Sequence, residues 1–215
     1  MAEPFEVDFR QPGAAAAAQV TAIAGLILAA GASRRMGVPK ANLDYRGETF
    51  LNRLIRILGE VSSPVVVVLG PDAGPIRETI TRPAEFVVNP EPERGQLTSL
   101  QCGLRAIPAA ARAVMFTPLD YPAVEPSTVH SLADAWRPDV PLILPRHAGR
   151  RGHPVLLGAG LIPEFLALPE SATARDVVRR HAAQYVDVDD AGVVTDVDTP
   201  EDYRRLLEIG ERASL

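Results

Sequence analysis

The stretch Leu28-Ala-Ala-Gly-Ala-Ser-Arg-Arg-Met-Gly-Val-Pro-Lys40 decides how the rest of this chain is interpreted. It follows an apolar run, Ile23 to Leu28, which is typical of a β-strand that is buried on both faces. Gly31 and Gly37 permit backbone conformations that other residues resist, and they let a ligand approach the main chain closely. Successive backbone N–H groups in such a loop form a concavity that binds anions, and the two arginines and the lysine add positive charge. A strand that opens into this loop therefore predicts a polyphosphate site.

From Ile23 onward, predicted strands and helices alternate along the chain. Apolar runs predict strands over residues 23–28, 64–70, 85–88, 113–117, 142–144, 153–157 and 184–188. Apolar positions at helical spacing predict helices over residues 48–60, 72–81, 96–106, 125–136, 160–168 and 173–182, with a last helix opening at 198–202. This alternation predicts an α/β fold of three layers, in which a mostly parallel sheet carries helices on both faces. Ligands of such sheets bind beyond the carboxyl ends of the strands, where the Gly31 loop is expected to lie.

The domain organisation is expected to be simple. Residues 1–22 contain an alanine run with no amphipathic period, so they are expected to form an N-terminal arm that is flexible. Residues 23–215 are expected to form a single domain, because a chain of this length can bury a substantial core by itself.

Composition excludes several classes of protein. The net charge of -5 gives no basic field of the kind that binds nucleic acid. No apolar run approaches the length of about 18 residues that a membrane span needs. A single cysteine, Cys102, excludes an intramolecular disulfide and favours a reducing compartment. Acidic residues stand where a signal peptide would need positive charge, so the expected location is the cytoplasm.

Three polar segments follow predicted strands or open predicted helices. Asp120 comes directly after a buried strand and lies between two prolines. Asp198 precedes a helix whose start is marked by Thr199 as N-cap and Pro200 as first residue. The segment Gly95 to Ser99 opens a helix, whose free N–H groups and dipole favour an anion or a base carbonyl. Ordinary turn, capping and dipole roles explain each segment as well, so these patterns alone leave the choice open.

The opening loop matches neither of the two common phosphate loops, because it lacks both G-x-x-x-x-G-K-[ST] and G-x-G-x-x-G. It does resemble the L-A-A-G-x-S-x-R-M-G-x-x-K signature of MobA-like nucleotidyltransferases. The resemblance continues through four further segments: N-P…G-x-x-x-S-L-x-x-G-L from Asn89, P-x-D-x-P around Asp120, G-H-P-V-L around His153, and D-x-D-T-P-E-D ending at Asp202. Together these segments span roughly residues 23–208. The resemblance implies the Rossmann-like fold of these enzymes and the transfer of a nucleoside monophosphate.

The resemblance also implies a role for each matched residue. It places Lys40, Arg34, Arg35 and Asp120 in the catalytic group, with Lys40 and one of the two arginines on the triphosphate. The nucleotide-binding residues that it implies are Leu28, Ala29, Ala30, Gly31, Lys40, Asn89, Gly95 and Ser99. It makes Asp120 and Asp198 the ligands of Mg²⁺ and places His153 on the acceptor side. A plain position at the entry of a strand is the alternative for His153.

The implied reaction joins a nucleoside monophosphate to a phosphorylated acceptor and releases pyrophosphate. Ala30 and the G-H-P-V-L segment resemble the cytidylyltransferases that act on molybdopterin, so the expected substrates are CTP and molybdopterin, with molybdoenzymes receiving the product. One departure leaves the acceptor open, because those enzymes carry D-Q-P where this chain has Asp120-Tyr-Pro122. A sugar-phosphate or alcohol-phosphate acceptor and guanylyl transfer are alternatives within the class. A catalytically silent nucleotide-binding regulator is the alternative outside it.

The two aspartates carry the sharpest structural expectation. Asp120 and Asp198 should meet at one Mg²⁺ beside the α-phosphate, since Mg²⁺ takes one or two carboxylates together with substrate phosphates and water. Neither has a lysine or arginine nearby in the sequence. Two carboxylates brought together without a cation would raise the pKa of at least one of them, so strain is expected at this point in the protein without metal.

Overall fold

The apolar run of the opening stretch forms the central strand of the fold. A computed structural model describes residues 22–31, 33, 35–71 and 73–212. Strand β1 (Ile23–Ala29) is buried along its whole length and pairs in parallel with β4 (Val65–Leu69) and with β6 (Ala113–Pro118). Of the expected N-terminal arm, the structure describes residue 22 alone, and Arg34 also lies outside the described residues. Burial on both faces explains why β1, β4 and β6 read as continuous apolar runs.

The main sheet is mixed but mostly parallel, as the sequence predicts. Its strand order is β10-β7-β9-β6-β1-β4-β5, and β8 pairs with β7 beside this path. The remaining strands of this sheet are β5 (Glu85–Val88), β7 (Leu142–His147), β8 (Arg150–Arg151), β9 (Val155–Gly158) and β10 (Ala183–Asp187). Strand β9 runs antiparallel to β6 and β7, and β8 runs antiparallel to β7, whereas the other neighbours are parallel.

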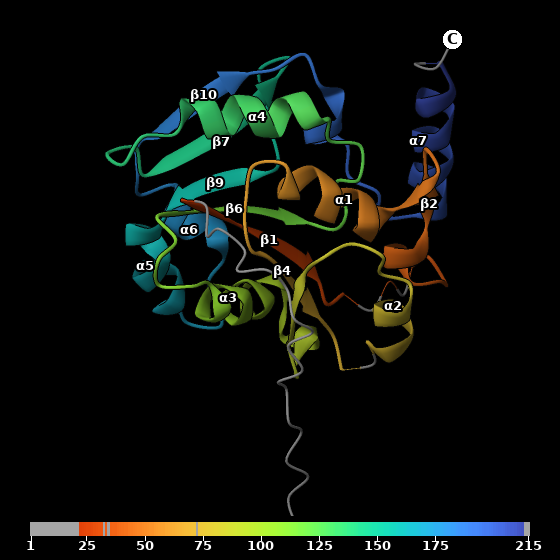
Figure 1. Cartoon of the computed structure of the whole chain (residues 1–215), viewed down its shortest axis with the longest axis horizontal. Helices are drawn as coiled ribbons and strands as arrows, with labels where there is room; N and C mark the ends of the chain where they lie inside the picture. Colours follow the sequence, from red (N-terminus) through yellow and green to blue (C-terminus); the bar gives the residue numbers. More distant parts are fainter. Residues whose placement is uncertain (1–21, 32, 34, 72, 213–215) are drawn as a thin grey trace, which may run out of the picture.

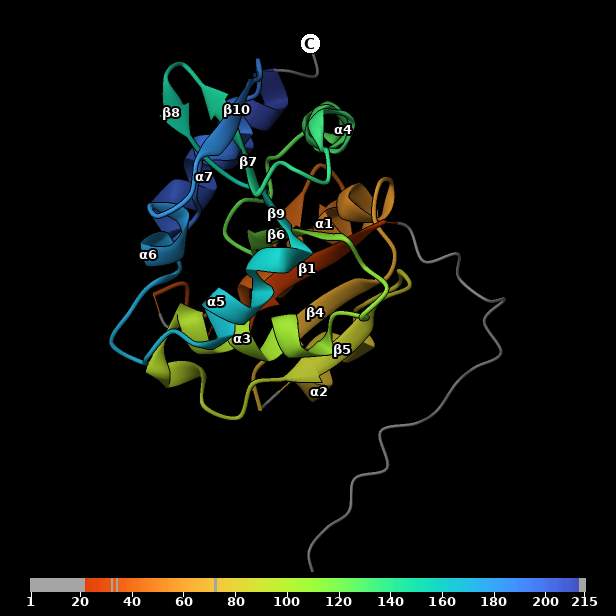
Figure 2. The same cartoon turned by 90° about the vertical axis from the view of Figure 1, so that its left-hand side faces the viewer.

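Helices cover both faces of the sheet, which gives the three layers (Figure 1). One face is covered by α1 (Phe50–Gly59) and α4 (Pro126–Ala135). The other face is covered by α3 (Gln96–Ala106), α5 (Ile162–Leu166) and α6 (Ala174–Val178), and Figure 2 shows α3 and α5 side by side on it. The short helix α2 (Gly74–Glu78) follows β4, and α7 (Pro200–Arg212) lies beside the small hairpin of β2 (Asp44–Tyr45) and β3 (Glu48–Thr49). Within the described residues, none of the helices has the length and apolarity needed to cross a bilayer.

The carboxyl ends of four parallel strands meet at one edge of the sheet. The backbone continues the pairing there, because Leu119 N–H donates to the Leu28 carbonyl at 3.0 Å and Asn89 N–H donates to the Leu69 carbonyl at 2.8 Å. The residues that follow β1, β4, β5 and β6 are therefore held side by side. This edge is where an α/β sheet of this kind binds its ligand.

Several elements are shorter than the sequence predicts. The helix expected from residue 48 begins at Phe50, because Glu48 and Thr49 pair as β3 across a turn in which Arg46 and Gly47 have positive φ. The helices expected over 72–81 and 173–182 are observed as the single turns α2 and α6, and the helix expected over 160–168 is observed as a 3-10 turn at Ala159–Leu161 that runs directly into α5. Strand β8 was not predicted, since two exposed arginines show no apolar pattern.

The start of the last helix agrees with its sequence signal. Helix α7 begins at Pro200, and the Thr199 hydroxyl accepts the Asp202 N–H at 3.2 Å while the Asp202 carboxylate accepts the Thr199 N–H at 2.9 Å. This reciprocal cap fixes the backbone directly after Asp198.

Candidate active site

The loop after β1 folds back on itself and brings Lys40 to the edge of the sheet. Ser33 and Gly37 have positive φ values of 49° and 70°, and the Met36 N–H donates to the Ser33 carbonyl at 2.9 Å. The Ser33 hydroxyl then accepts the Lys40 backbone N–H at 3.0 Å, which anchors the short 3-10 helix at Lys40–Asn42. The backbone of Gly31 does not adopt the positive φ that favours glycine. A side chain there would meet no protein atom within 4 Å, so its backbone faces open space.

The Lys40 ammonium group lies between the two predicted metal ligands. Its Nζ is 2.9 Å from Asp120 Oδ1 and 2.7 Å from Asp198 Oδ1, although the three residues are far apart in the sequence. Arg35 donates to the other oxygen of the second carboxylate, Asp198 Oδ2, at 3.0 Å. Lys40 is only 7% exposed, whereas the Arg35 side chain is 68% exposed. One buried and one exposed cation therefore neutralise the two carboxylates.

Backbone contacts hold Asp120 and Asp198 at neighbouring positions. The Val197 N–H donates to the Asp120 carbonyl at 2.9 Å, so the segment before α7 runs beside the end of β6. Asp190, which precedes Val197 in the sequence, makes further contacts: its carboxylate accepts the Glu125 N–H at 2.9 Å and the Thr128 hydroxyl at 2.7 Å. These hydrogen bonds hold the segment after β10 against the start of α4.

The pKa values of the two aspartates shift in opposite directions. Burial raises the pKa of Asp120, and the charge of Lys40 and its hydrogen bond oppose this change. The pKa of Asp198 is lowered, first by the hydrogen bond from Lys40, with Arg35 adding to the effect against a desolvation cost. The two side chains are similarly exposed, at 33% and 32%, so the difference follows from their partners, because Asp120 contacts one cation and Asp198 contacts two.

These contacts correct one expectation from the sequence. Asp120 and Asp198 do come together, and the pKa of one of them is raised as expected, but the expectation that no cation lies between them is wrong, since Lys40 contacts both. The negative charge of Asp198 is a smaller cause of the raised pKa of Asp120 than burial is. Distance along the chain hid this arrangement, because each carboxylate meets its cation only through the fold.

These groups open onto a cleft of about 470 Å³ at the carboxyl ends of the strands. Of the residues that the sequence singles out, the cleft is lined by Leu28, Ala29, Ala30, Gly31, Arg35, Lys40, Ser99, Asp120 and Asp198. The sequence reasoning missed six further lining residues: Ser33, Pro92, Glu93, Gln96, Pro118 and Leu119. Ser33 and Pro118 carried a signal, since each is a fixed position of a quoted signature, and Gln96 and Leu119 are adjacent to Gly95 and Asp120. Glu93 and Pro92 carried none beyond their place in a charged, proline-rich loop.

A second hollow of about 240 Å³ continues from the cleft toward α2. Its walls are mostly small and apolar side chains from the ends of β1 and β4 and from the segment beyond: Ala29, Ala30, Ala41, Pro71, Ala73, Ile76, Pro92 and Leu119. The backbones approach closely here, because a side chain on Gly70 would meet the Ala30 carbonyl oxygen at 3.1 Å. Lys40 and Gly31 line both hollows, so the two form one continuous site.

Asn89, Gly95 and His153 do not line the cleft in this structure. The Asn89 amide donates to the Ser99 hydroxyl at 2.9 Å and to the Thr98 hydroxyl at 3.0 Å, so it positions the start of α3. Gly95 precedes α3 with a φ of 110°, which favours glycine at this corner.

His153 lies behind the cleft, next to the residue that follows Asp120. Its ring packs against Tyr121, with centroids 4.7 Å apart, and against Phe116 at 5.9 Å. Burial lowers the pKa of His153 to about 4, and its Nδ1 atom is buried without a hydrogen-bond partner in the described structure. The preceding Gly152 is required by packing, since any side chain would overlap the Val193 carbonyl. The observed contacts of this segment are therefore with the protein's own loops.

The donor set at the cleft suits a hard divalent cation. Within the described residues, no three histidine, cysteine or acidic side chains come together as a metal-binding group. Two carboxylates suffice for a cation that shares its remaining positions with substrate phosphates and water. The oxygens of Asp120 and Asp198 face the cleft and already attract one cationic group, so the residues fit a divalent ion.

A mostly parallel sheet with a cationic loop and two acidic side chains at its carboxyl edge defines a nucleotide-binding transferase of the α/β class. Residues 25–186 match the model of the MobA-like NTP transferase domain, and this chain belongs to that family. It is a nucleotidyltransferase.

Individual relatives are similar over almost their whole length. The molybdenum cofactor cytidylyltransferase of Escherichia coli (strain K12) is 29% identical, over 86% of this chain and 95% of its own. The nicotine blue oxidoreductase of Paenarthrobacter nicotinovorans is 32% identical, over 86% of this chain and 96% of its own. Proteins named as probable molybdenum cofactor guanylyltransferases match as well, over 58% of the length of the one from Opitutus terrae and 96% of the one from Bacillus cytotoxicus.

A solved structure shows the same fold. The crystal structure of Rv0371c from Mycobacterium tuberculosis H37Rv superposes with a TM-score of 0.79 at 32% identity and covers 88% of this chain and 98% of its own. A structure of that protein in complex with manganese is also similar, with a TM-score of 0.73.

Proposed function

We propose that this enzyme transfers CMP from CTP to the phosphate group of molybdopterin and releases pyrophosphate. The observation that carries the proposal is the meeting of Lys40, Asp120 and Asp198, with N–O distances of 2.9 and 2.7 Å, in a cleft at the carboxyl ends of parallel strands. A buried lysine beside two carboxylates suits a triphosphate that arrives with a divalent cation. The relative named as a molybdenum cofactor cytidylyltransferase supports the choice of substrates.

Catalysis in this proposal consists of positioning and charge neutralisation. The acceptor phosphate is largely dianionic at pH 7, so it attacks the α-phosphorus in line without a general base. Lys40 and Arg35 would contact the triphosphate and stabilise the charge that develops on the leaving pyrophosphate. The loop after β1 would hold the phosphates with its backbone N–H groups, because Gly31 leaves the main chain open to the cleft. Arg34 stays a prediction, since it lies outside the described residues.

The cation is proposed to be Mg²⁺, held by Asp120 and Asp198. When bound, it neutralises phosphate oxygens and fixes the triphosphate relative to the acceptor. The similar mycobacterial protein has a structure in complex with manganese, which supports the binding of a divalent ion.

The base is proposed to lie in the smaller hollow between the ends of β1 and β4. Its volume of about 240 Å³ and its wall of Ala30, Ala73 and Ile76 favour a pyrimidine over a purine. The Ala30 methyl group occupies space where a glycine would leave room for a larger base. Guanylyl transfer is the alternative, and relatives with that name make it a necessary arm of the test.

The acceptor is proposed to bind on the side of Asp120 where Tyr121 and His153 lie. Tyr121 follows Asp120 directly and its ring packs against His153, although neither ring lines the cleft or the smaller hollow. Asp120 itself lines the cleft, so an acceptor on this side would lie close to the α-phosphate in the proposed complex. A sugar-phosphate or alcohol-phosphate acceptor is the alternative.

The test is release of pyrophosphate from each of CTP, GTP, UTP and ATP, with molybdopterin, a sugar phosphate or no acceptor. Release from CTP that depends on molybdopterin and Mg²⁺ is the expected result. Faster release from GTP would reassign the nucleotide, and nucleotide binding without release would favour a silent regulator. Nicotine blue should be included because of the oxidoreductase relative, and no turnover of it is expected.

The proposed location is the cytoplasm. The single cysteine, Cys102, lies half-buried on α3 as a free thiol, which suits a reducing compartment. Molybdoenzymes that take up the completed cofactor are the proposed partners.

A further inference from the structure

Lys40 is the only lysine in this chain, since the other 21 of its 22 basic residues are arginines. We propose that the Lys40 ammonium group holds the metal position between Asp120 and Asp198, and that it is exchanged for the divalent cation when the metal–nucleotide complex binds. The inference rests on the proposed nucleotide and metal site, and it adds a second role for Lys40 beyond contact with phosphate.

The geometry of the oxygens leads to this inference. Of the four carboxylate oxygens of Asp120 and Asp198, Lys40 contacts one on each residue and Arg35 contacts a third. Within the described part of the chain, Asp120 Oδ2 is the one that has no cationic partner. Both oxygens of Asp198 have a cationic partner, so a cation that coordinates both residues at about 2.1 Å must displace Lys40 or Arg35 from Asp198. Lys40 is the group that contacts both carboxylates, so a cation placed between them competes with its ammonium group.

A lysine suits a charge that is exchanged for a metal ion better than it suits a permanent ion pair. Lysine carries a compact charge on a flexible stem, whereas arginine presents a planar fork that suits fixed pairs. The Lys40 backbone is anchored by the Ser33 hydroxyl at 3.0 Å and by its place in a 3-10 helix, so only the side chain needs to move. In a chain whose other basic residues are all arginine, a lysine at this one position is consistent with a mobile charge.

The destination of the ammonium group is close by. Lys40 lines both the cleft of about 470 Å³ and the smaller hollow beside it, so a triphosphate in the cleft lies within reach of its side chain. The phosphates attract the ammonium group away from the carboxylates, and the departing group exposes the oxygens to the cation. Metal and nucleotide should therefore bind together, and metal should bind weakly without nucleotide.

The first test measures Mn²⁺ binding without nucleotide, by electron paramagnetic resonance, in the full chain and in Lys40→Met. The variant should bind one Mn²⁺ at least about tenfold more tightly than the parent, because its carboxylates have lost their competitor. Adding Asp120→Asn to the variant should remove that gain. Arg46→Met is the matched control, since Arg46 pairs with Glu125 outside the cleft, and its Mn²⁺ affinity should equal that of the parent. Equal or weaker Mn²⁺ binding by Lys40→Met would overturn the inference.

The second test needs no variant. Protein labelled with ¹⁵N only in lysine gives one side-chain signal, from Lys40, because no other lysine is present. Mg²⁺ alone or nucleotide alone should leave this signal near its starting position, while Mg²⁺ together with CTP should move it. A signal that does not move with both present would contradict the exchange.

These tests separate the inference from the proposed function. Neither uses an acceptor or turnover, and the Mn²⁺ test uses no nucleotide. Tighter Mn²⁺ binding by Lys40→Met together with no pyrophosphate release from any nucleotide would keep the exchange and refute the proposed reaction. The reverse pair of results would refute the exchange alone.

Discussion

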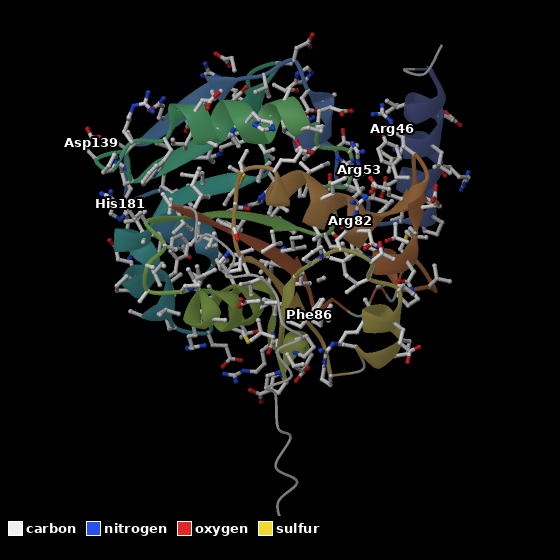
Figure 3. All side chains as sticks on the ribbon, viewed as in Figure 1. Arg46, Arg53, Arg82, Phe86, Asp139 and His181 are labelled. Atoms are coloured by element: carbon white, nitrogen blue, oxygen red, sulfur yellow. The ribbon has the colours of Figure 1, made fainter. Side chains whose placement is uncertain are left out.

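Among the residues that the structure describes, two buried cations, Lys40 and Arg53, lie beside acidic groups, and only Lys40 faces a cleft. Lys40 is 7% exposed and contacts two carboxylates that line the site. Arg53 is 5% exposed and donates to the Pro122 carbonyl at 2.8 Å and to the Val124 carbonyl at 3.2 Å. The Arg53 guanidinium also lies over the Tyr45 ring, with its central carbon 5.2 Å from the ring centroid. Figure 3 labels Arg53 and Arg46.

The difference lies in what each cation could exchange for. The Arg53 partners are two backbone carbonyls and, at 3.5 Å, the Glu125 carboxylate, and no ligand can replace the guanidinium without leaving the carbonyls unpaired. The Lys40 partners are side chains at the wall of an open cleft, so a metal ion can take its place. A buried cation is therefore structural when its partners are enclosed, and functional when they face a ligand site.

The largest expected effect is a loss of turnover when either carboxylate that contacts Lys40 is replaced. Asp120→Asn and Asp198→Asn should each lower kcat by more than about 1,000-fold, because the lost charge removes both a metal ligand and a stabilising group at the transition state. Pyrophosphate release with CTP measures this effect. Glu125→Gln, which removes an acidic group outside the cleft, is the matched control and should keep kcat within about threefold. Retained turnover in either aspartate variant would show that its carboxylate is not part of the reaction.

The next largest effect is on the free energy of unfolding, and it is expected when Arg53 is replaced. Arg53→Met should lower the free energy of unfolding by about 2–4 kcal/mol, since it leaves two buried carbonyls without their donor. The folded variant should keep most of its turnover, which is the opposite of the result expected for the two aspartate variants. Urea denaturation and kcat on the same sample compare the two quantities. A stable Arg53→Met protein with normal turnover would show that the loop between β6 and α4 does not need this arginine.

A smaller effect should appear in the pH dependence of stability. The pKa of Asp198 is lowered in the folded protein, so its ionised form stabilises the fold at neutral pH, and this contribution is lost as pH falls through the lowered value. The pKa of Asp120 is raised above its ordinary 3.8, so its ionisation costs stability at neutral pH, and that cost disappears as pH falls below 3.8.

Asp198→Asn should therefore lose stability at pH 7 and lose less at pH 3.5, whereas Asp120→Asn should lose less than Asp198→Asn at pH 7. Urea denaturation at several pH values measures both series. Identical pH dependence in the two variants would contradict the assignment of opposite pKa shifts.

The smallest expected effect concerns the choice of base. Ala30→Gly should reduce the preference for CTP over GTP by up to about tenfold, because one methyl group in a pocket discriminates by that order. The ratio of kcat/KM for the two nucleotides measures it. Ala41→Gly, in the same hollow but away from β1, is the control. If Ala41→Gly changed the ratio more than Ala30→Gly, the base would have to bind nearer to Ala41 than to Ala30.

The sequence predicted the fold well where local patterns carry the information. The runs at Ile23, Pro64 and Ala113 are buried on both faces, so their apolar character alone identifies central strands. The short elements were harder, because α2 has no buried residues and β8 consists of two exposed arginines, so neither has a hydrophobic period.

The site was predictable in its parts but not in its arrangement. Lys40, Asp120 and Asp198 each stand out at the end of a strand or the start of a helix. The contact of Lys40 with both carboxylates spans 80 and 158 positions, and no local pattern encodes it. His153 shows the opposite case, since a conspicuous segment turned out to pack against Tyr121 and the Val193 backbone.

The most direct test of the whole account is a crystal structure of the protein with Mn²⁺ and a CTP analogue that cannot be cleaved at the α-phosphate. Anomalous scattering locates the manganese without reference to the protein chain. The account predicts one strong peak within about 2.0–2.2 Å of an oxygen of Asp120 and of Asp198, as expected for a small divalent ion, with Lys40 Nζ on a phosphate oxygen. A peak elsewhere, or carboxylates more than about 8 Å apart with nucleotide bound, would contradict it.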